Sequence, residues 1–145
     1  MADIIFDQTG SIESFTQNID ILSAKSGSVM ILACDANGFK KELIDPILLK
    51  HTISIMGGIY PSIVYNTKKY DQGTLFIGFN EKMKINIIKE ISEKSYDQLD
   101  ADVEEQIGDF DESFKTMFVY IDGLTKNIGK CVNILFDNYG LGINY

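Results

Sequence analysis

The feature that most constrains the fold of this chain is an apolar run, ending in aspartate and glycine, that occurs twice. The first copy covers residues 28–38 and the second covers residues 116–125. Each run is too short for a helix and too uniformly apolar for an edge strand, which is typical of a buried central strand. Because a helical pattern follows each run, the sequence predicts two βα units in one sheet.

The two predicted units differ in how far they extend. After the first run the sequence predicts a helix and a second strand over residues 53–56, which a turn at Gly57 and Gly58 ends. The matching strand after the second run would begin near Ile143, but the sequence reaches only Tyr145. We therefore expect the second unit to be incomplete, with the remainder in a longer polypeptide or supplied by another chain.

Hydrophobic spacing predicts the other elements. Apolar residues at helical spacing indicate four helices, at residues 11–22, 45–51, 99–107 and 125–139. Residues 63–65 and 74–79 are expected to form an antiparallel hairpin, and residues 83–88 a further strand. The predicted fold class is therefore α/β, with a mixed sheet of about six strands, flanking helices and the two βα units at its centre. We divide the chain into an N-terminal helix and lead-in, residues 1–27, and one domain, residues 28–145.

The ends of the two apolar runs are the candidate ligand site. Open α/β sheets bind ligands outside the carboxyl ends of their strands, so Asp35 and Asp122 are placed to hydrogen-bond the amine or hydroxyl of a ligand in a shared crevice. The alternative is that each aspartate only shapes a βα loop. The candidate ligand-binding residues are these aspartates and their polar, tyrosine and glycine neighbours in the predicted turns: Asp35, Asn37, Gly57, Gly58, Tyr60, Asp122, Gly123 and Thr125.

Composition excludes several classes of partner. The formal charge is −8 and all thirteen basic residues are Lys, which argues against a nucleic-acid or anionic-membrane surface. No apolar run approaches the roughly 20 residues of a membrane span, and the first ten residues do not match a secretory signal. Two separated cysteines do not make a disulfide framework. These features favour a cytoplasmic protein.

No catalytic set is visible, so we expect a protein that is not an enzyme. A Ser or Cys triad needs a histidine base, and His51 is the only histidine. Its place at the end of a short predicted helix suits an imidazolium near the helix dipole. The alternative role for His51 is that of an axial haem ligand. We otherwise expect no cofactor and no bound metal.

Several of these segments together resemble the N-terminal part of FIST sensory domains. The similar segments are residues 29–38, 43–49, 55–61, 70–79 and 118–124. The resemblance covers about residues 28–145. It implies an intracellular ligand-sensing module that is joined to the remainder of a FIST module or to a signalling output protein. It also implies small ligands such as amino acids, and in some members haem that senses nitric oxide.

Three functional hypotheses follow. The first is a non-enzymatic sensory domain that binds an amino-acid-like ligand in the crevice and passes the signal to an output domain by a population shift. The second keeps the sensory role but makes the cofactor haem, held by His51. The third is a ligand-free interaction domain, which pairs with a second chain through an exposed strand edge.

Overall fold

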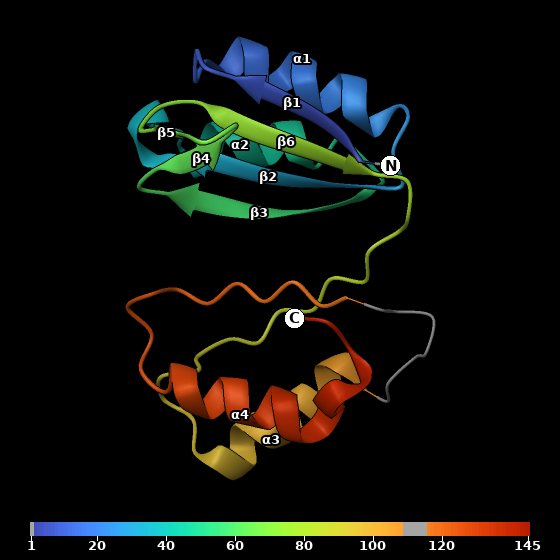
Figure 1. Ribbon diagram of the computed structural model, residues 1–145, viewed down its shortest axis with the longest axis vertical. Coiled ribbons are helices and arrows are strands. Elements are labelled where there is room, and N and C mark those ends of the chain that lie inside the picture. Colours follow the sequence, from blue (N-terminus) through green and yellow to red (C-terminus); the bar gives the residue numbers. More distant parts are fainter. Residues whose placement is uncertain (1, 109–115) are drawn as a thin grey trace. The chain divides into compact units, whose positions relative to one another are not determined.

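The computed structural model describes residues 2–108 and 116–145 of the chain. The chain divides into two compact units, unit 1 (Met1–Ile85) and unit 2 (Asn86–Tyr145), each of which is described by itself. Figure 1 shows strands and helices in unit 1 and two α-helices in unit 2. No helix in the described part of the chain is long and apolar enough to cross a membrane.

Unit 1 is built on a four-stranded mixed sheet with the order β1-β6-β2-β3 (Figure 1). Its strands are β1 (Asp3–Asp7), β2 (Ser28–Cys34), β3 (Ser54–Tyr60) and β6 (Thr74–Phe79). β2 runs parallel to β3 and antiparallel to β6, which in turn pairs antiparallel with β1. The predicted mixed α/β class is therefore confirmed. β1 was not predicted, because its five residues include two aspartates and show no strand-like alternation.

The first βα unit is confirmed as β2, a 3₁₀ turn η1 (Asp35–Asn37), helix α2 (Lys41–Leu48) and β3. Asp45 does not cap α2 as predicted, because the helix begins at Lys41, within residues 40–44 for which an irregular or helical lead-in was expected. The amides of Leu43 and Ile44 both donate to the Lys40 carbonyl, so the first turn forms upstream of Pro46. Proline at the start of a helix is favoured but not obligatory, and here it lies inside the last turns.

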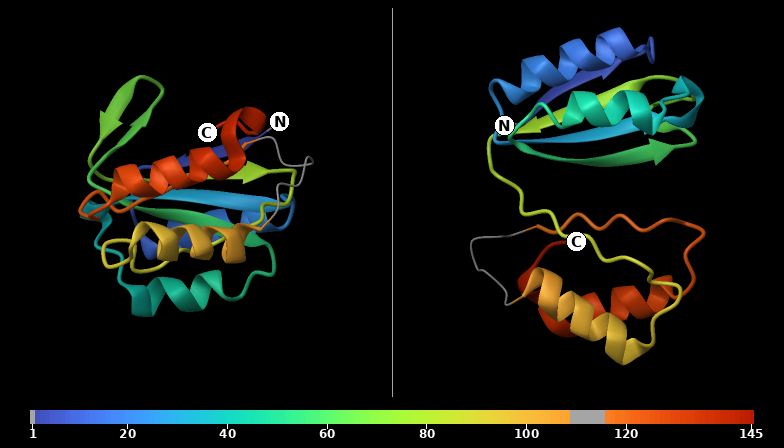
Figure 2. Two further views of the ribbon diagram at one scale, coloured as in Figure 1. Left: turned by 90° about the horizontal axis from the view of Figure 1, so that it is seen from below. Right: turned by 180° about the vertical axis from the view of Figure 1, so that it is seen from behind.

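Helices α1 (Ile12–Ser23) and α2 cover one face of this sheet (Figure 2). The predicted cap of α1 is confirmed, since the Ser14 amide donates to Ser11 Oγ at 3.1 Å. Its predicted apolar stripe is also confirmed, because the side chains on that stripe are buried. The buried core on this face consists of Phe15, Ile19, Leu22, Val29, Ile31, Ile47 and Phe76.

A β-hairpin packs against the other face of the sheet. It consists of β4 (Ile63–Tyr65) and β5 (Lys68–Tyr70), which pair with each other. The predicted pairing of residues 63–65 with residues 74–79 is therefore wrong. The reason is the two-residue turn Asn66-Thr67, in which both residues have positive φ, of 46° and 65°. Such a turn matches the twist of a tight hairpin and closes it locally.

Strand β3 continues through the two glycines that were expected to end it. Gly57 pairs with Ile31 and Gly58 with Leu32 in the parallel β2–β3 ladder. The predicted turn at Gly57 and Gly58 is therefore wrong. A Cβ atom on Gly57 would lie 1.8 Å from the Ile31 carbonyl oxygen, and the φ of Gly57 is +154°. Glycine serves here as the residue that lets two backbones approach each other.

Unit 2 is a helical pair. Helix α3 (Tyr96–Ile107) packs against α4 (Ile128–Tyr139), which the 3₁₀ turn η2 (Gly140–Gly142) follows. The predicted stripe of α3 is confirmed at its buried residues Leu99 and Val103. Its N-terminus has a capping box, in which Ser95 and Gln98 bond each other's amides. The other buried members of this core are Cys131, Ile134, Leu135 and Tyr139.

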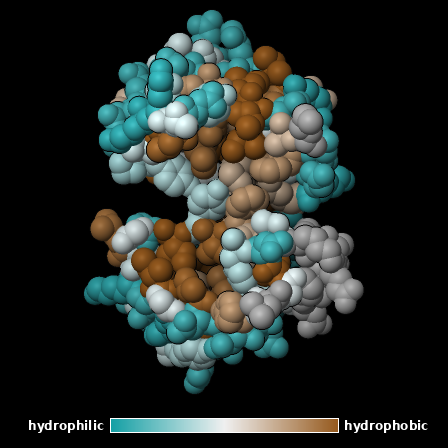
Figure 3. All heavy atoms as spheres, in the orientation of Figure 1, coloured by the Kyte–Doolittle hydropathy of each residue, from teal (hydrophilic) through white to brown (hydrophobic). Residues whose placement is uncertain are grey.

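The predicted end of α4 at Tyr139 is confirmed, but its predicted start and part of its buried face need correction. Thr125 does not cap the helix, which begins at Ile128 after Asn127. Val132 and Phe136 were expected on its buried side but are half exposed. Figure 3 shows hydrophobic residues at the surface of unit 2. The predicted helical spacing of α4 is confirmed. Its apolar residues extend around more of the helix than the face that packs against α3.

The second predicted βα unit lacks its strand. Within the described residues, neither residues 83–88 nor residues 117–121 form a strand, and both predictions are wrong. A single bridge joins Thr116 to Asn144. Met117 and Ile121 pack instead against the α3–α4 core, which buries apolar side chains without a strand partner.

Candidate functional site

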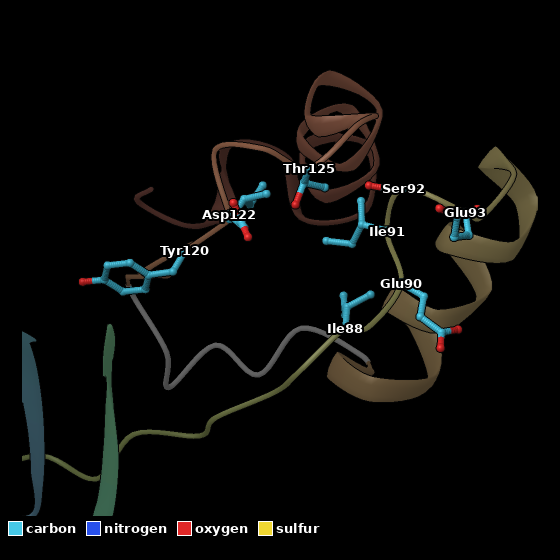
Figure 4. Close-up of a pocket in the computed structure, with 9 residues that line it drawn as sticks. Ile88, Glu90, Ile91, Ser92, Glu93, Tyr120, Asp122 and Thr125 are labelled. Carbon is cyan, nitrogen blue, oxygen red and sulfur yellow. The ribbon is translucent and has the colours of Figure 1, made fainter. Parts of the chain in front are cut away.

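Unit 2 contains an open pocket of about 330 Å³ beside the start of α4. It lies between the segment that leads into α3 and the segment that leads into α4 (Figure 4). Two of its lining residues, Asp122 and Thr125, were predicted as ligand-binding residues. The lining residues are Ile88, Glu90, Ile91, Ser92, Glu93, Tyr120, Ile121, Asp122 and Thr125.

One tight turn supplies two of the polar side chains of the pocket, those of Asp122 and Thr125. Asp122 Oδ1 accepts from the Leu124 amide at 2.8 Å, and the Asp122 carbonyl accepts from the Thr125 amide at 2.9 Å. The turn therefore fixes the carboxylate and the hydroxyl in a small space. Within the described chain, Asp122 Oδ2 and Thr125 Oγ1 have no hydrogen-bond partner. Figure 4 shows both side chains beside Ile91 at the pocket.

Hydrogen bonds tie the two sides of the pocket together. The Lys126 amide donates to Ser92 Oγ at 2.9 Å, and Asn127 Nδ2 donates to the Ser92 carbonyl at 3.2 Å. Glu90 and Asn127 have positive φ, of 60° and 68°. Backbone in this region is costly for residues other than glycine and is concentrated at binding and catalytic sites. The pocket is thus held between two strained but cross-linked segments.

Three isoleucines form an apolar wall of the pocket. Ile88, Ile91 and Ile121 also pack against the helical core of unit 2. Burial raises the pKa of the Tyr120 phenol, so this side chain is a neutral hydroxyl at physiological pH. Figure 4 shows the carboxylates of Glu90 and Glu93 directed away from Asp122. The pocket therefore offers one converging carboxylate and one converging hydroxyl beside an apolar wall.

Asp35 and Asn37 lie in the 3₁₀ turn of unit 1, where Asn37 has a structural role. Its Nδ2 donates to the Gly73 carbonyl at 2.8 Å and to Thr74 Oγ1 at 3.0 Å. Its Oδ1 accepts from the Gly73 amide at 2.8 Å. These bonds join the end of β2 to the start of β6 and occupy the side-chain amide.

Replacing Asn37 by alanine is expected to destabilise unit 1 by roughly 2 to 3 kcal/mol, because three hydrogen bonds are lost and partly buried groups on Gly73 and Thr74 lose their partner. Asp35→Ala is the control, since no side-chain hydrogen bond of Asp35 is present in the described structure. Urea unfolding followed by circular dichroism measures the difference. Equal stability of the two variants would contradict the structural role of Asn37.

The other predicted site residues are dispersed. Gly57 and Gly58 lie within β3 of unit 1, whereas Tyr60 is the last residue of that strand and pairs with Cys34 at the end of β2. Gly123 belongs to the Asp122 turn, and no atom lies within 4 Å of the position its Cβ would take. The structure thus brings Asp122 and Thr125 into one pocket, whereas the predicted crevice that they share with Asp35 stays a prediction.

His51 packs inside unit 1 rather than at a recognisable metal centre. Its side chain is largely buried, and Nε2 lies 3.4 Å from Asp20 Oδ1 on α1. Burial raises the pKa of the Cys34 and Cys131 thiols, which disfavours the thiolates that metals prefer. In the described ranges no three His, Cys, Asp or Glu side chains gather as a metal site.

The sequence did not point to Ile88, Ile91, Ser92 or Tyr120 as pocket residues. Ile88 and Tyr120 were placed on predicted strands, so their apolar character was assigned to sheet packing. The positive φ of Glu90 has no sequence signal, because glutamate rarely adopts it. A useful signal would have been the Asp122-Gly123-Leu124-Thr125 turn opposite a short polar interruption at Ser92 and Glu93.

Relationships to other proteins give no independent indication of function. Comparisons with protein-family models, with curated proteins and with solved structures find no match to this chain. The resemblance to FIST sensory domains therefore stays a prediction from short segments, and the functional argument depends on the geometry of the pocket.

Proposed function

We propose that this chain is a non-enzymatic, intracellular sensory module that binds a small amino-acid-like ligand in the pocket of unit 2. The observation that carries the proposal is the convergence of Asp122 and Thr125 beside an apolar wall. Ligand pockets in proteins typically combine a mostly apolar lining with a few placed polar groups. The pocket volume of about 330 Å³ lies at the small end of such sites, which suits a small metabolite.

The charge of the pocket favours a ligand with a protonated amine. Asp122 Oδ2 can accept from an ammonium group, and charge-assisted hydrogen bonds are about twice as strong as neutral ones. Thr125 can accept or donate to a second polar group, and the isoleucines suit an aliphatic portion. Unit 2 contains twelve Asp and Glu but only five Lys, so its field attracts cations.

The position of the pocket suggests how binding would be transmitted. Residues 88–93 lead into α3, and residues 120–125 lead into α4. A ligand that bonds Asp122 and contacts Ile91 would hold the two lead-in segments together. It would then favour the arrangement of α3 and α4 in which the pocket is formed, by a shift of population. We propose that a separate or attached output protein responds to that arrangement.

A panel of free amino acids, other small amines and haem tests the proposal by thermal unfolding of the whole chain. A ligand at a hundredfold excess over its Kd is expected to stabilise the native state by about 2.7 kcal/mol. For an ammonium ligand, Asp122→Asn should weaken binding at least about tenfold, because a charge-assisted bond becomes a neutral one. Thr125→Val should weaken it less.

Glu104→Gln is the matched control, since it also removes one negative charge from an exposed position of unit 2 but lies on α3, away from the pocket lining. It should leave the affinity within about twofold, as expected for a screened surface charge. Equal weakening by Asp122→Asn and Glu104→Gln would show that the ligand responds only to net charge. No stabilisation by any member of the panel would count against the sensory function.

A further inference from the structure

Strand β3 forms one edge of the unit 1 sheet, and its sequence has neither charged residues nor proline. Natural edge strands carry charged residues, proline or bulges that prevent pairing with another chain. The opposite edge, β1, carries Asp3 and Asp7, and Asp3 forms an ion pair with Lys25 at 2.8 Å. The seven residues of β3 include no charged residue and no proline. The two edges of the same sheet are therefore protected very differently (Figure 1).

The middle of β3 is accessible. Gly57 is exposed, and 56% of the surface of Ile59 is exposed. Gly57 and Gly58 also present backbone without bulky side chains. An isoleucine and two glycines on a strand edge form a surface on which a second strand can align by main-chain hydrogen bonds.

The order of residues in β3 suits pairing with a second copy of itself. In an antiparallel pair centred on Gly57, Ile55 faces Ile59 of the second copy and Met56 faces Gly58. Aliphatic side chains then stack on one face, and each methionine lies over a glycine on the other. Because such a pair has twofold symmetry, the same contacts form twice and the assembly closes as a dimer.

The distribution of charge also favours a second copy over a charged partner. Unit 1 contains nine Asp and Glu and eight Lys, a formal charge of −1 out of the −8 of the whole chain. The unit that carries β3 therefore adds little charge repulsion to the pairing of two copies. A basic or acidic partner would gain no electrostatic attraction at this edge. An identical neutral strand can pair here without such attraction.

We propose that β3 pairs antiparallel with β3 of a second copy of this chain, which joins two four-stranded sheets into one eight-stranded sheet. The paired edge covers Gly57 and Ile59, and none of the residues that line the unit 2 pocket belongs to β3. The proposal therefore uses no residue of the proposed ligand site.

The mass of the full chain in solution tests the proposal. Light scattering after size exclusion should give twice the chain mass of 16.3 kDa for the natural sequence. Ile59→Lys should give the monomer mass, because a lysine on an edge strand blocks pairing. The matched control is Val64→Lys on β4, where the residue is 69% exposed, and this variant should remain a dimer.

Amide hydrogen exchange gives a second measurement that does not depend on the folding of a variant. In the natural sequence, protection of residues 55–59 should rise at least tenfold with increasing protein concentration, while protection within α3 should not change. A natural chain that stays monomeric at high concentration would overturn the proposal. So would a dimeric Ile59→Lys variant, or a dimer in which exchange at residues 55–59 is independent of concentration.

Discussion

Replacing Gly57 by alanine is expected to destabilise unit 1 by at least about 3 kcal/mol. The added Cβ would lie 1.8 Å from the Ile31 carbonyl oxygen and 2.9 Å from the Ile31 amide nitrogen. Both contacts are with backbone of the neighbouring strand, so relief requires β2 and β3 to separate. The φ of +154° adds strain for any residue with a side chain. The measurement is hydrogen exchange of the β2 and β3 amides, which should lose their protection.

Gly58→Ala is the matched control for this prediction. The nearest atom to its added Cβ is the Tyr60 hydroxyl at 3.2 Å, and this atom ends a side chain that can move. We expect a change within about 1 kcal/mol, because propensity in a strand favours alanine slightly over glycine. If both variants were equally stable, the close approach of β2 and β3 at Gly57 would be contradicted.

Replacing Phe76 by alanine is expected to destabilise unit 1 by about 3 to 5 kcal/mol. Phe76 is 0% exposed and lies on β6, between β1 and β2 in the sheet. Its ring packs 5.3 Å from that of Phe15 on α1, so it joins the sheet to its helical cover. Removal of the ring leaves a cavity that surrounding strands cannot close. Urea unfolding followed by far-ultraviolet circular dichroism measures the loss.

Phe136→Ala is the control, because it removes the same side chain from a residue that is 50% exposed on α4. We expect a loss below about 1.5 kcal/mol, as half of the ring is already in contact with water. Hydrogen exchange should also show that Phe76→Ala affects unit 1 while α3 and α4 keep their protection. A loss of protection that is equal in both units would contradict separate cores.

The helices were predicted well because their hydrogen bonds and caps are local. The Ser11 cap and the stripe of Phe15, Ile19 and Leu22 are short-range patterns, and both are present. The stripe of α3 is likewise confirmed at Leu99 and Val103. The predicted starts of α2 and α4 were wrong because several residues near each start could cap the helix, as Asp45 and Thr125 could.

Strands were predicted less well because a strand depends on its neighbour. Residues 117–121 have the apolar character of a central strand, but in the structure Met117 and Ile121 contact the helical core instead. Residues 68–70 have little strand character, yet the Asn66-Thr67 turn places them beside β4. Apolar content alone cannot distinguish these outcomes, since either partner buries the same side chains.

The candidate site also combines features that the local sequence predicted with features that it did not. The Asp122 turn was recognisable from its aspartate, glycine and threonine, because an Asx turn is a local structure. The opposite side of the pocket, with Ser92 and Ile91, lies about thirty residues away in sequence and depends on the hydrogen bonds to Lys126 and Asn127. Asn37 has a polar side chain of the kind that binds ligands, but its hydrogen bonds to Gly73 and Thr74 give it a structural role.

The sequence by itself determined the mixed α/β class, the strand–helix–strand unit of β2 and β3, and the apolar faces of α1 and α3. These depend on periodicity and on caps within a few residues, where the chain interacts with itself locally. The tertiary structure alone decided which strands are neighbours, why Gly57 must be glycine, and which segments form the pocket. Those features depend on contacts between segments that are distant in sequence, where close packing selects one partner among several of equal hydrophobicity.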